Sequence, residues 1–212
     1  MRIIQPSYEI ITPLDGAAIL RHIETCGRVC YKSEDKITDG SAERFVRGII
    51  RLGHEAVLEH YSFTVRFIVD RGISHEIVRH RLASYCQESS RYCNYTGDKF
   101  GKEITVIEPS FLPEGSVAYE EWRMACLRAE EAYFWMIRSG FKPEQARDVL
   151  PTSLKTELVM TANLREWRTV FKLRTSPAAH PQIREVMVPL LQECQQRIPV
   201  VFDDLVKERK DA

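Results

Sequence analysis

The spacing of apolar residues along this chain of 212 residues changes between a period of two and a helical period. Apolar and polar residues alternate over 63–69, which predicts a strand, and β-branched residues predict extended backbone over 2–11. Shorter apolar runs at 104–107 and 156–161 predict two further strands.

Helical spacing occupies much of the remaining chain and is bounded by capping residues. Asp15 is the expected cap of the first helix, and Gly53 the expected end of the second. Ser74 is the expected cap of a helix that extends through Arg81, after a turn at 70–72. We expect the helices at about 16–26, 41–52, 74–81, 116–137, 143–149, 163–174 and 182–197. Helices and strands follow one another without a regular βαβ order, so we expect an α+β fold rather than a doubly wound sheet.

Composition and charge narrow the class of protein. No linker or repeat interrupts the chain, which predicts a single catalytic domain over 1–212 with a frayed, charged tail at about 207–212. The balance of 30 basic and 30 acidic residues argues against a general nucleic-acid binder. No apolar run approaches the roughly 20 residues that span a bilayer, and residues 1–16 lack the features of a signal peptide. We therefore expect a cytoplasmic protein with no membrane or nucleic-acid partner.

The most basic stretch of the chain is RHRLASYCQESSR, at residues 79–91. Three arginines and a histidine in a chain of zero net charge indicate a site for a small anionic ligand, because a guanidinium fork matches phosphate and carboxylate oxygens. On the expected helix Arg79 and Arg81 point about 200° apart, so one pocket holds both only if its ligand is large. A solvated basic helix face is the alternative interpretation.

Polar side chains on the expected helix 163–174 form two groups. Asn163 and Arg174 return to within about 20° of one another, whereas Arg165 and Thr169 share a different face. Two polar faces on one short helix indicate contact with two partners, for example a ligand in one subunit and a neighbouring subunit.

Residues 53–64 hold two histidines and two glutamates at a helix–strand junction. A His-Glu-x-x-His zinc motif is excluded because Leu58 lies four positions after His54, so we expect no metal site. The six cysteines form no Cys-x-x-Cys pair, and we expect them to be free thiols. No glycine-rich nucleotide loop occurs, and Ser89 has no histidine at a telling spacing, which favours ligand binding over nucleophilic attack.

These segments together resemble the flavin-dependent thymidylate synthases. The family signature, Arg-His-Arg followed by seven residues and Ser, is met by residues 79–81 and Ser89. GHEAVLEHYSFTVRF resembles the family segment before this signature, NLREWRTVFKLR resembles its C-terminal helix, and Arg147 begins its Arg-x-x-Leu-Pro stretch. The resemblance covers roughly residues 50–180 in collinear order.

The resemblance implies a homotetramer whose active sites are shared between subunits and which converts dUMP to dTMP by reductive methylation. 5,10-Methylenetetrahydrofolate would supply the carbon, and FAD reduced by NADPH would supply the hydride. Arg174 would be the catalytic residue, because a fixed positive charge stabilises the enolate-like uracil whose C5 is nucleophilic. The implied dUMP contacts are Glu76, Arg79, Gln87, Glu88, Ser89, Ser90, Arg91, Arg147 and Arg174. The implied FAD contacts are Arg79, His80, Arg81, Gln87, Asn163, Leu164, Arg165, Thr169, His54 and Glu59.

Four positions depart from the family pattern. Glu76 replaces a glutamine of the dUMP-binding helix, and Gln87 stands where a glutamate is common. Ala56 and Thr169 stand where side chains often contact FAD. The additional carboxylate of Glu76 would repel a phosphate unless it is protonated or paired.

Two alternative functions stay open at this point. A non-catalytic nucleotide- or RNA-binding protein would use the same arginines for phosphate contacts, would bind no flavin and would show a steep salt dependence. A flavoenzyme of the same fold could instead act on a different pyrimidine.

Overall fold

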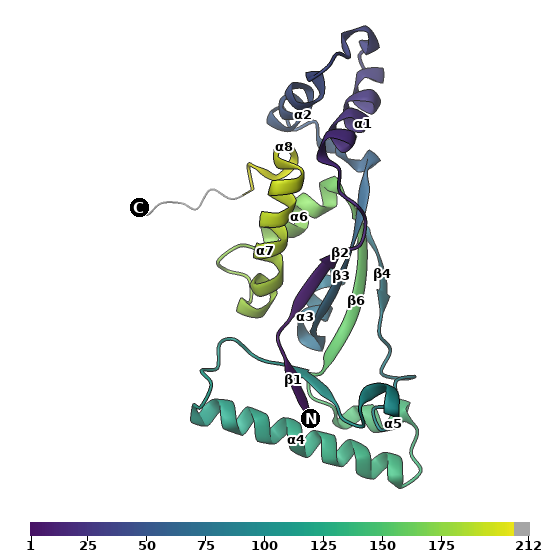
Figure 1. Cartoon of the computed structure of the whole chain (residues 1–212), viewed down its shortest axis with the longest axis vertical. Helices are drawn as coiled ribbons and strands as arrows, with labels where there is room; N and C mark the ends of the chain where they lie inside the picture. Colours follow the sequence, from purple (N-terminus) through teal and green to yellow (C-terminus); the bar gives the residue numbers. More distant parts are fainter. Residues whose placement is uncertain (206–212) are drawn as a thin grey trace. The chain divides into compact units, whose positions relative to one another are not determined.

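The computed structural model describes residues 1–205 and divides them into two compact units (Figure 1). The first unit consists of 1–8, 66–79 and 85–159, and the second of 9–65, 80–84 and the chain from Met160 onward. The tail expected at about 207–212 lies outside the described residues. The single catalytic domain stays a prediction.

The described residues form two sheets. β1 (Arg2–Ile4) and β5 (Thr105–Ile107) pair in parallel within the first unit, with Ile3 opposite Val106. The larger sheet has the strand order β2-β3-β6-β4. Its strands are β2 (Ser7–Ile10), β3 (Ser62–Asp70), β6 (Lys155–Asn163) and β4 (Ala83–Gln87). Buried and more exposed residues alternate along β6 and most of β3, which confirms both predicted strands.

The first unit packs its short strands against one long helix. Its helices are α3 (Arg71–Ile77), α4 (Val117–Arg138), α5 (Pro143–Ala146) and the 3-10 turns η3 (Asp98–Phe100) and η4 (Arg147–Val149). The Ser116 side chain accepts from the backbone N–H of Tyr119 and starts α4, and Gly140 follows its end at φ 89°. Tyr133 of α4 is fully buried in a cluster with Ile104 and Val106 beside β5. The predicted helix 116–137 is therefore confirmed.

The second unit is mainly helical. Its helices are α1 (Gly16–Val29), α2 (Ser41–Arg51), α6 (Leu164–Arg174), α7 (Pro181–Arg197) and α8 (Pro199–Phe202), with 3-10 turns η1 (Glu34–Lys36) and η2 (Glu55–His60). Asp15 caps α1 by accepting from the backbone N–H of Ala18, as predicted. Trp167 of α6 is fully buried and stacks on Phe63 at a ring distance of 4.7 Å. α7 lies beside α6 and α8, and α1 beside α2 (Figure 1).

The helix expected to carry the Arg-His-Arg triplet is shorter than predicted. The carboxylate of Asp70 accepts from the backbone N–H of Ile73 at 2.7 Å, so α3 starts at the expected turn and ends at Ile77. The Ser74 hydroxyl instead donates to the carbonyl of Arg71 at 2.9 Å inside the helix. Residues 79–81 lie beyond α3, in the connection to β4, and the 200° argument does not apply to them.

Five elements escaped the sequence pattern. β4 runs through Ser84 and Gln87, whose polar side chains hide the period of two. The other four, η1, η2, η3 and α8, are three to six residues long, which is too short to show a helical period. Within residues 1–205, no helix combines the length and the apolar character that crossing a membrane requires.

Candidate functional site

The Arg-His-Arg triplet turns its middle residue inward. Arg79 and Arg81 are exposed, whereas only 6% of His80 is exposed. The arginines are therefore available to ligands, and the histidine belongs to the interior of the second unit. Its two ring nitrogens contact other side chains of the protein, and its assignment as an FAD contact stays a prediction.

His80 lies between two charged residues of α6. The Nε of Arg174 donates to its Nε2 at 3.0 Å, and a carboxylate oxygen of Glu166 lies 3.4 Å from its Nδ1. Burial, together with the charge of Arg174, lowers the pKa of His80 to about 4. The imidazole is thus neutral at pH 7. The hydrogen bond joins Arg174, the residue predicted to be catalytic, to the Arg-His-Arg triplet ninety-four residues earlier in the chain.

The start of α6 presents polar groups outward. Asn163 caps the helix by accepting from the backbone N–H of Glu166 at 2.8 Å. Arg165 is half exposed and pairs with Glu59 at 2.6 Å, and the Thr169 hydroxyl donates to the carbonyl of Arg165 at 3.3 Å. These residues form the second polar face predicted for this helix.

Leu164 does not share that face. Its side chain is fully buried, and its backbone N–H donates to the carbonyl of Tyr61 at 2.9 Å. The leucine belongs to the core stripe of α6, and its contact with FAD stays a prediction.

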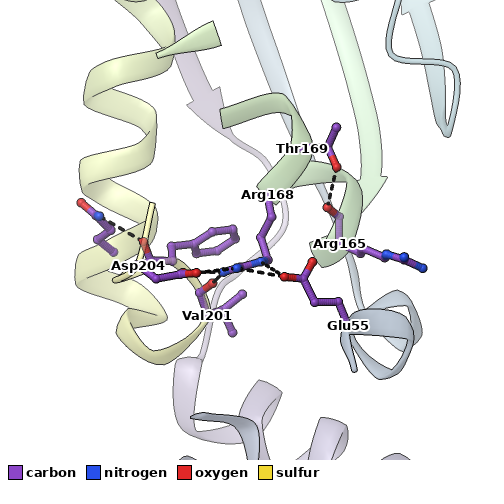
Figure 2. A network of polar contacts seen from close by, with 8 residues as sticks. Glu55, Arg165, Arg168, Thr169, Val201 and Asp204 are labelled. Carbon is purple, nitrogen blue, oxygen red and sulfur yellow. Dashed lines mark hydrogen bonds and ion pairs between the residues drawn. The ribbon is translucent and has the colours of Figure 1, made fainter. Parts of the chain in front are cut away.

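A buried arginine on the same helix escaped the sequence analysis. Only 1% of Arg168 is exposed, and its guanidinium donates to Glu55 at 3.1 Å, to Asp204 at 2.6 Å and to the carbonyl of Val201 (Figure 2). Figure 2 shows Arg165 and Arg168 leaving α6 on different sides. Arg168 lies one position after Trp167, and an arginine beside an apolar stripe gives no signal in the sequence that it is buried.

His54 and Ala56 are exposed at η2. His54 lines a hollow of about 490 Å³ whose walls include Tyr31, Phe45 and Arg44. The second unit therefore combines exposed guanidinium groups with a partly aromatic hollow. This donor set suits FAD, since arginines pair with a diphosphate and aromatic walls accept a flat ring.

A separate hollow in the first unit carries the predicted nucleotide contacts Ser90 and Arg147. It encloses about 440 Å³, and Arg147 donates to the Ser90 hydroxyl at 3.5 Å. Arg71 and His75 of α3 also line it and were missed by the sequence analysis. Their spacing of four on one helix face is the signal that could have found them. Two arginines against one aspartate, Asp148, make this hollow suitable for an anion.

Other predicted dUMP contacts point elsewhere in the first unit. The amide of Gln87 donates to Ser74 at 2.9 Å and to Thr156 at 3.2 Å, so it faces inward. Glu88 pairs with Lys155 at 2.9 Å beside a different hollow of about 450 Å³. Burial by itself would lower the pKa of Lys155, but its hydrogen bonds to two carboxylates raise that pKa.

The remaining predicted contacts are more open to solvent. Arg91 lies 3.8 Å from Glu144, and both side chains are about half exposed. Glu76 on α3 and Ser89 are half-buried. The sequence motif is thus not one pocket: the structure separates Ser90 from Glu88 and turns Gln87 into the core.

The fold and these surfaces define a class: an α+β protein with arginine-lined hollows that suit small anionic ligands. Comparison with known proteins assigns the family. Residues 17–200 match the family model described as thymidylate synthase complementing protein. The chain is 34% identical over 188 residues to a flavin-dependent thymidylate synthase of Pyrococcus furiosus, covering 87% of this chain and 75% of that protein. It is 34% identical over 201 residues to the Geobacter sulfurreducens enzyme of the same name, covering 88% and 85%.

The chain belongs to the flavin-dependent thymidylate synthase family. The family and enzyme class predicted from the motifs are therefore confirmed. The fold is also similar to that of PolB from Streptomyces cacaoi, a UMP/dUMP methylase solved with 5-Br dUMP. The TM-score is 0.77 with 24% sequence identity, over 96% of each chain, which supports the mixed α+β fold.

Proposed function

We propose that this protein converts dUMP to dTMP by reductive methylation. The methylene carbon of 5,10-methylenetetrahydrofolate bonds to C5 of the uracil, the C5 proton is lost, and a hydride completes the methyl group. The two electrons come from NADPH by way of FAD, so the products are dTMP, tetrahydrofolate and NADP⁺. The contact of Arg174 with His80 carries this proposal, because it joins the two parts of the family's site within one unit.

The dUMP phosphate is assigned to the hollow of Ser90 and Arg147. Arg147 is the family position for this contact, and Arg71 adds a second guanidinium in the same hollow. Guanidinium groups neutralise a phosphate without a proton to lose. Arg79, Arg91, Ser89 and Glu76 complete the proposed substrate site. Gln87 and Glu88 act on it indirectly, through the hydrogen bonds that shape β4 and its end.

Arg174 is the proposed catalytic residue. Deprotonation of the uracil places negative charge on its carbonyl oxygens, and a guanidinium already fixed in position stabilises that charge without reorganising. The hydrogen bond to the neutral ring of His80 fixes the plane of this guanidinium. Because the imidazole is neutral, it does not neutralise the positive charge that Arg174 directs at the substrate.

FAD is assigned to exposed groups that lie in the second unit, apart from Arg79, which belongs to the first. The proposed contacts are Arg79 and Arg81 of the triplet, Asn163, Arg165 and Thr169 of α6, and His54 and Glu59 of η2. When bound, FAD accepts a hydride from NADPH and delivers it to the methylene carbon. We also propose the cytoplasmic homotetramer that the resemblance implies, with active sites shared between subunits.

The test is a tritium-release assay with 5-labelled dUMP, methylenetetrahydrofolate and NADPH. We expect yellow protein with flavin absorbance and release that requires both co-substrates, and Arg174→Ala is expected to abolish turnover while flavin stays bound. Colourless protein that FAD cannot reconstitute, with RNA binding that falls steeply with salt, would favour the non-catalytic alternative. A parallel assay with 5-labelled UMP tests a different pyrimidine, and preference for UMP would overturn the assigned substrate.

A further inference from the structure

We infer that Glu166 is a positioning residue that sets the tautomer of His80 and through it orients Arg174. This inference rests on the proposed function only for the role of Arg174 in turnover. The three residues form a continuous chain in the second unit, with 3.4 Å between Glu166 and Nδ1 and 3.0 Å between Nε2 and Arg174.

The protons of this chain follow from its arginine. An arginine side chain has only N–H donors, so the Nε2 atom of His80 accepts and carries a lone pair. A neutral imidazole with a bare Nε2 holds its proton on Nδ1. That proton faces the oxygen of Glu166, and an ionised carboxylate at this place offers acceptors only. The two contacts of His80 thus define its tautomer.

Burial favours the neutral ring of His80 but acts against an ionised Glu166. His80 and Glu166 are 6% and 7% exposed, so water does not compete freely for their polar atoms. Burial raises the pKa of Glu166, and its place in the first turn of α6 acts in the opposite direction, because the positive end of the helix dipole stabilises a carboxylate. A doubly protonated His80 would place an N–H group against the N–H donor of Arg174. Burial together with the charge of Arg174 lowers the pKa of His80 to about 4.

The spacing along α6 explains why a histidine is needed. Glu166 and Arg174 are eight residues apart, about 12 Å along the helix axis, which is too far for them to pair directly without help. The ring of His80 spans the interval and presents an acceptor to the arginine. The buried middle residue of the triplet therefore acts inside the protein, while the flanking arginines are exposed to ligands.

The tautomer of His80 is the direct readout. Side-chain ¹⁵N spectra of histidine-labelled holoenzyme at pH 7.5, recorded by solid-state NMR, distinguish a proton on Nδ1 from one on Nε2. A His80→Gln variant identifies the signal. We expect the Nδ1–H form in the unmutated protein, and an Nε2–H or doubly protonated ring would overturn the inference whether or not any variant folds.

The kinetic test uses Glu166→Gln, whose amide can donate to Nδ1 and so permits the wrong tautomer. We expect kcat to fall about 10–100-fold, the range for residues that orient another group, with KM for dUMP within about twofold and flavin content unchanged. Glu166→Asp keeps the charge and is expected to recover part of the loss. Unchanged kcat in Glu166→Gln would overturn the inference.

Glu24→Gln is the matched control. Glu24 is a buried carboxylate of the same unit that pairs with Arg28 at 2.7 Å and does not contact the triplet. Loss of kcat in this control equal to that in Glu166→Gln would assign the effect to general destabilisation and overturn the positioning role. If the unmutated enzyme fails to turn over dUMP but shows the Nδ1–H ring, the proposed function fails and the tautomer assignment is supported.

Discussion

Replacing the buried arginine of α6 is expected to weaken the second unit more than removing an exposed arginine. Arg168→Met keeps most of the side-chain volume and removes the guanidinium. The fully buried Val201 then loses the donor to its carbonyl, which costs about 1–3 kcal/mol. Glu55 and Asp204, at 19% and 50% side-chain exposure, can turn toward water, so each adds at most about 1 kcal/mol.

The expected loss of unfolding free energy is therefore about 1–5 kcal/mol, or about 2–20 °C in Tm for a chain of this length. Urea unfolding followed by circular dichroism measures it, at fixed protein concentration because assembly adds to stability. Arg47→Met is the matched control, since Arg47 also bridges two carboxylates, Glu43 and Asp203, but is half exposed. A loss no larger in Arg168→Met than in Arg47→Met would refute the reasoning.

Three smaller effects follow from the same contacts. The hydrogen bond from Arg168 lowers the pKa of Asp204. The ionised carboxylate therefore stabilises the fold above its unfolded pKa of about 3.9, and this contribution disappears as pH falls through the lower folded pKa. Asp204→Asn should reduce the dependence of the unfolding midpoint on pH, measured between pH 3 and 6. Asp15→Ala removes the cap of α1 and should lower unfolding free energy by about 1 kcal/mol in urea titrations, whereas Asp15→Asn should not. Arg147→Lys should raise KM for dUMP about tenfold, because a lysine lacks the planar fork, and an unchanged KM would remove Arg147 from the phosphate site.

The regular elements of the fold were predictable because their patterns are local. The alternation over 63–69 and the cap at Asp15 depend on neighbouring residues only, and the structure contains them where expected. The end of α3 was not predictable in the same way. Asp70 and Ser74 are both good capping residues, and only the hydrogen bond to Ile73 shows which of them starts the helix.

The sequence predicted which residue types form the candidate site, but not which way their side chains point. The motif identifies a basic segment and its serines, but a sequence does not show that His80 and Gln87 turn inward while Arg81 turns outward. Arg71 and His75 escaped notice because they lie outside the motif, and their shared hollow depends on how residues 147–154 fold beside α3. Contacts with segments far away in the sequence decide where these side chains point.

The two buried charges of α6 also fix how that helix is rotated about its own axis. Glu166 and Arg168 are two residues apart and so point about 200° away from one another, one toward His80 and the other toward Glu55 and Asp204. An apolar stripe alone tolerates a small turn of a helix against its neighbours, because one hydrophobic contact can replace another. Polar contacts on opposite sides do not, since any rotation that relaxes one separates the other. They therefore limit the rotation of α6, and with it the direction in which its last residue, Arg174, is presented.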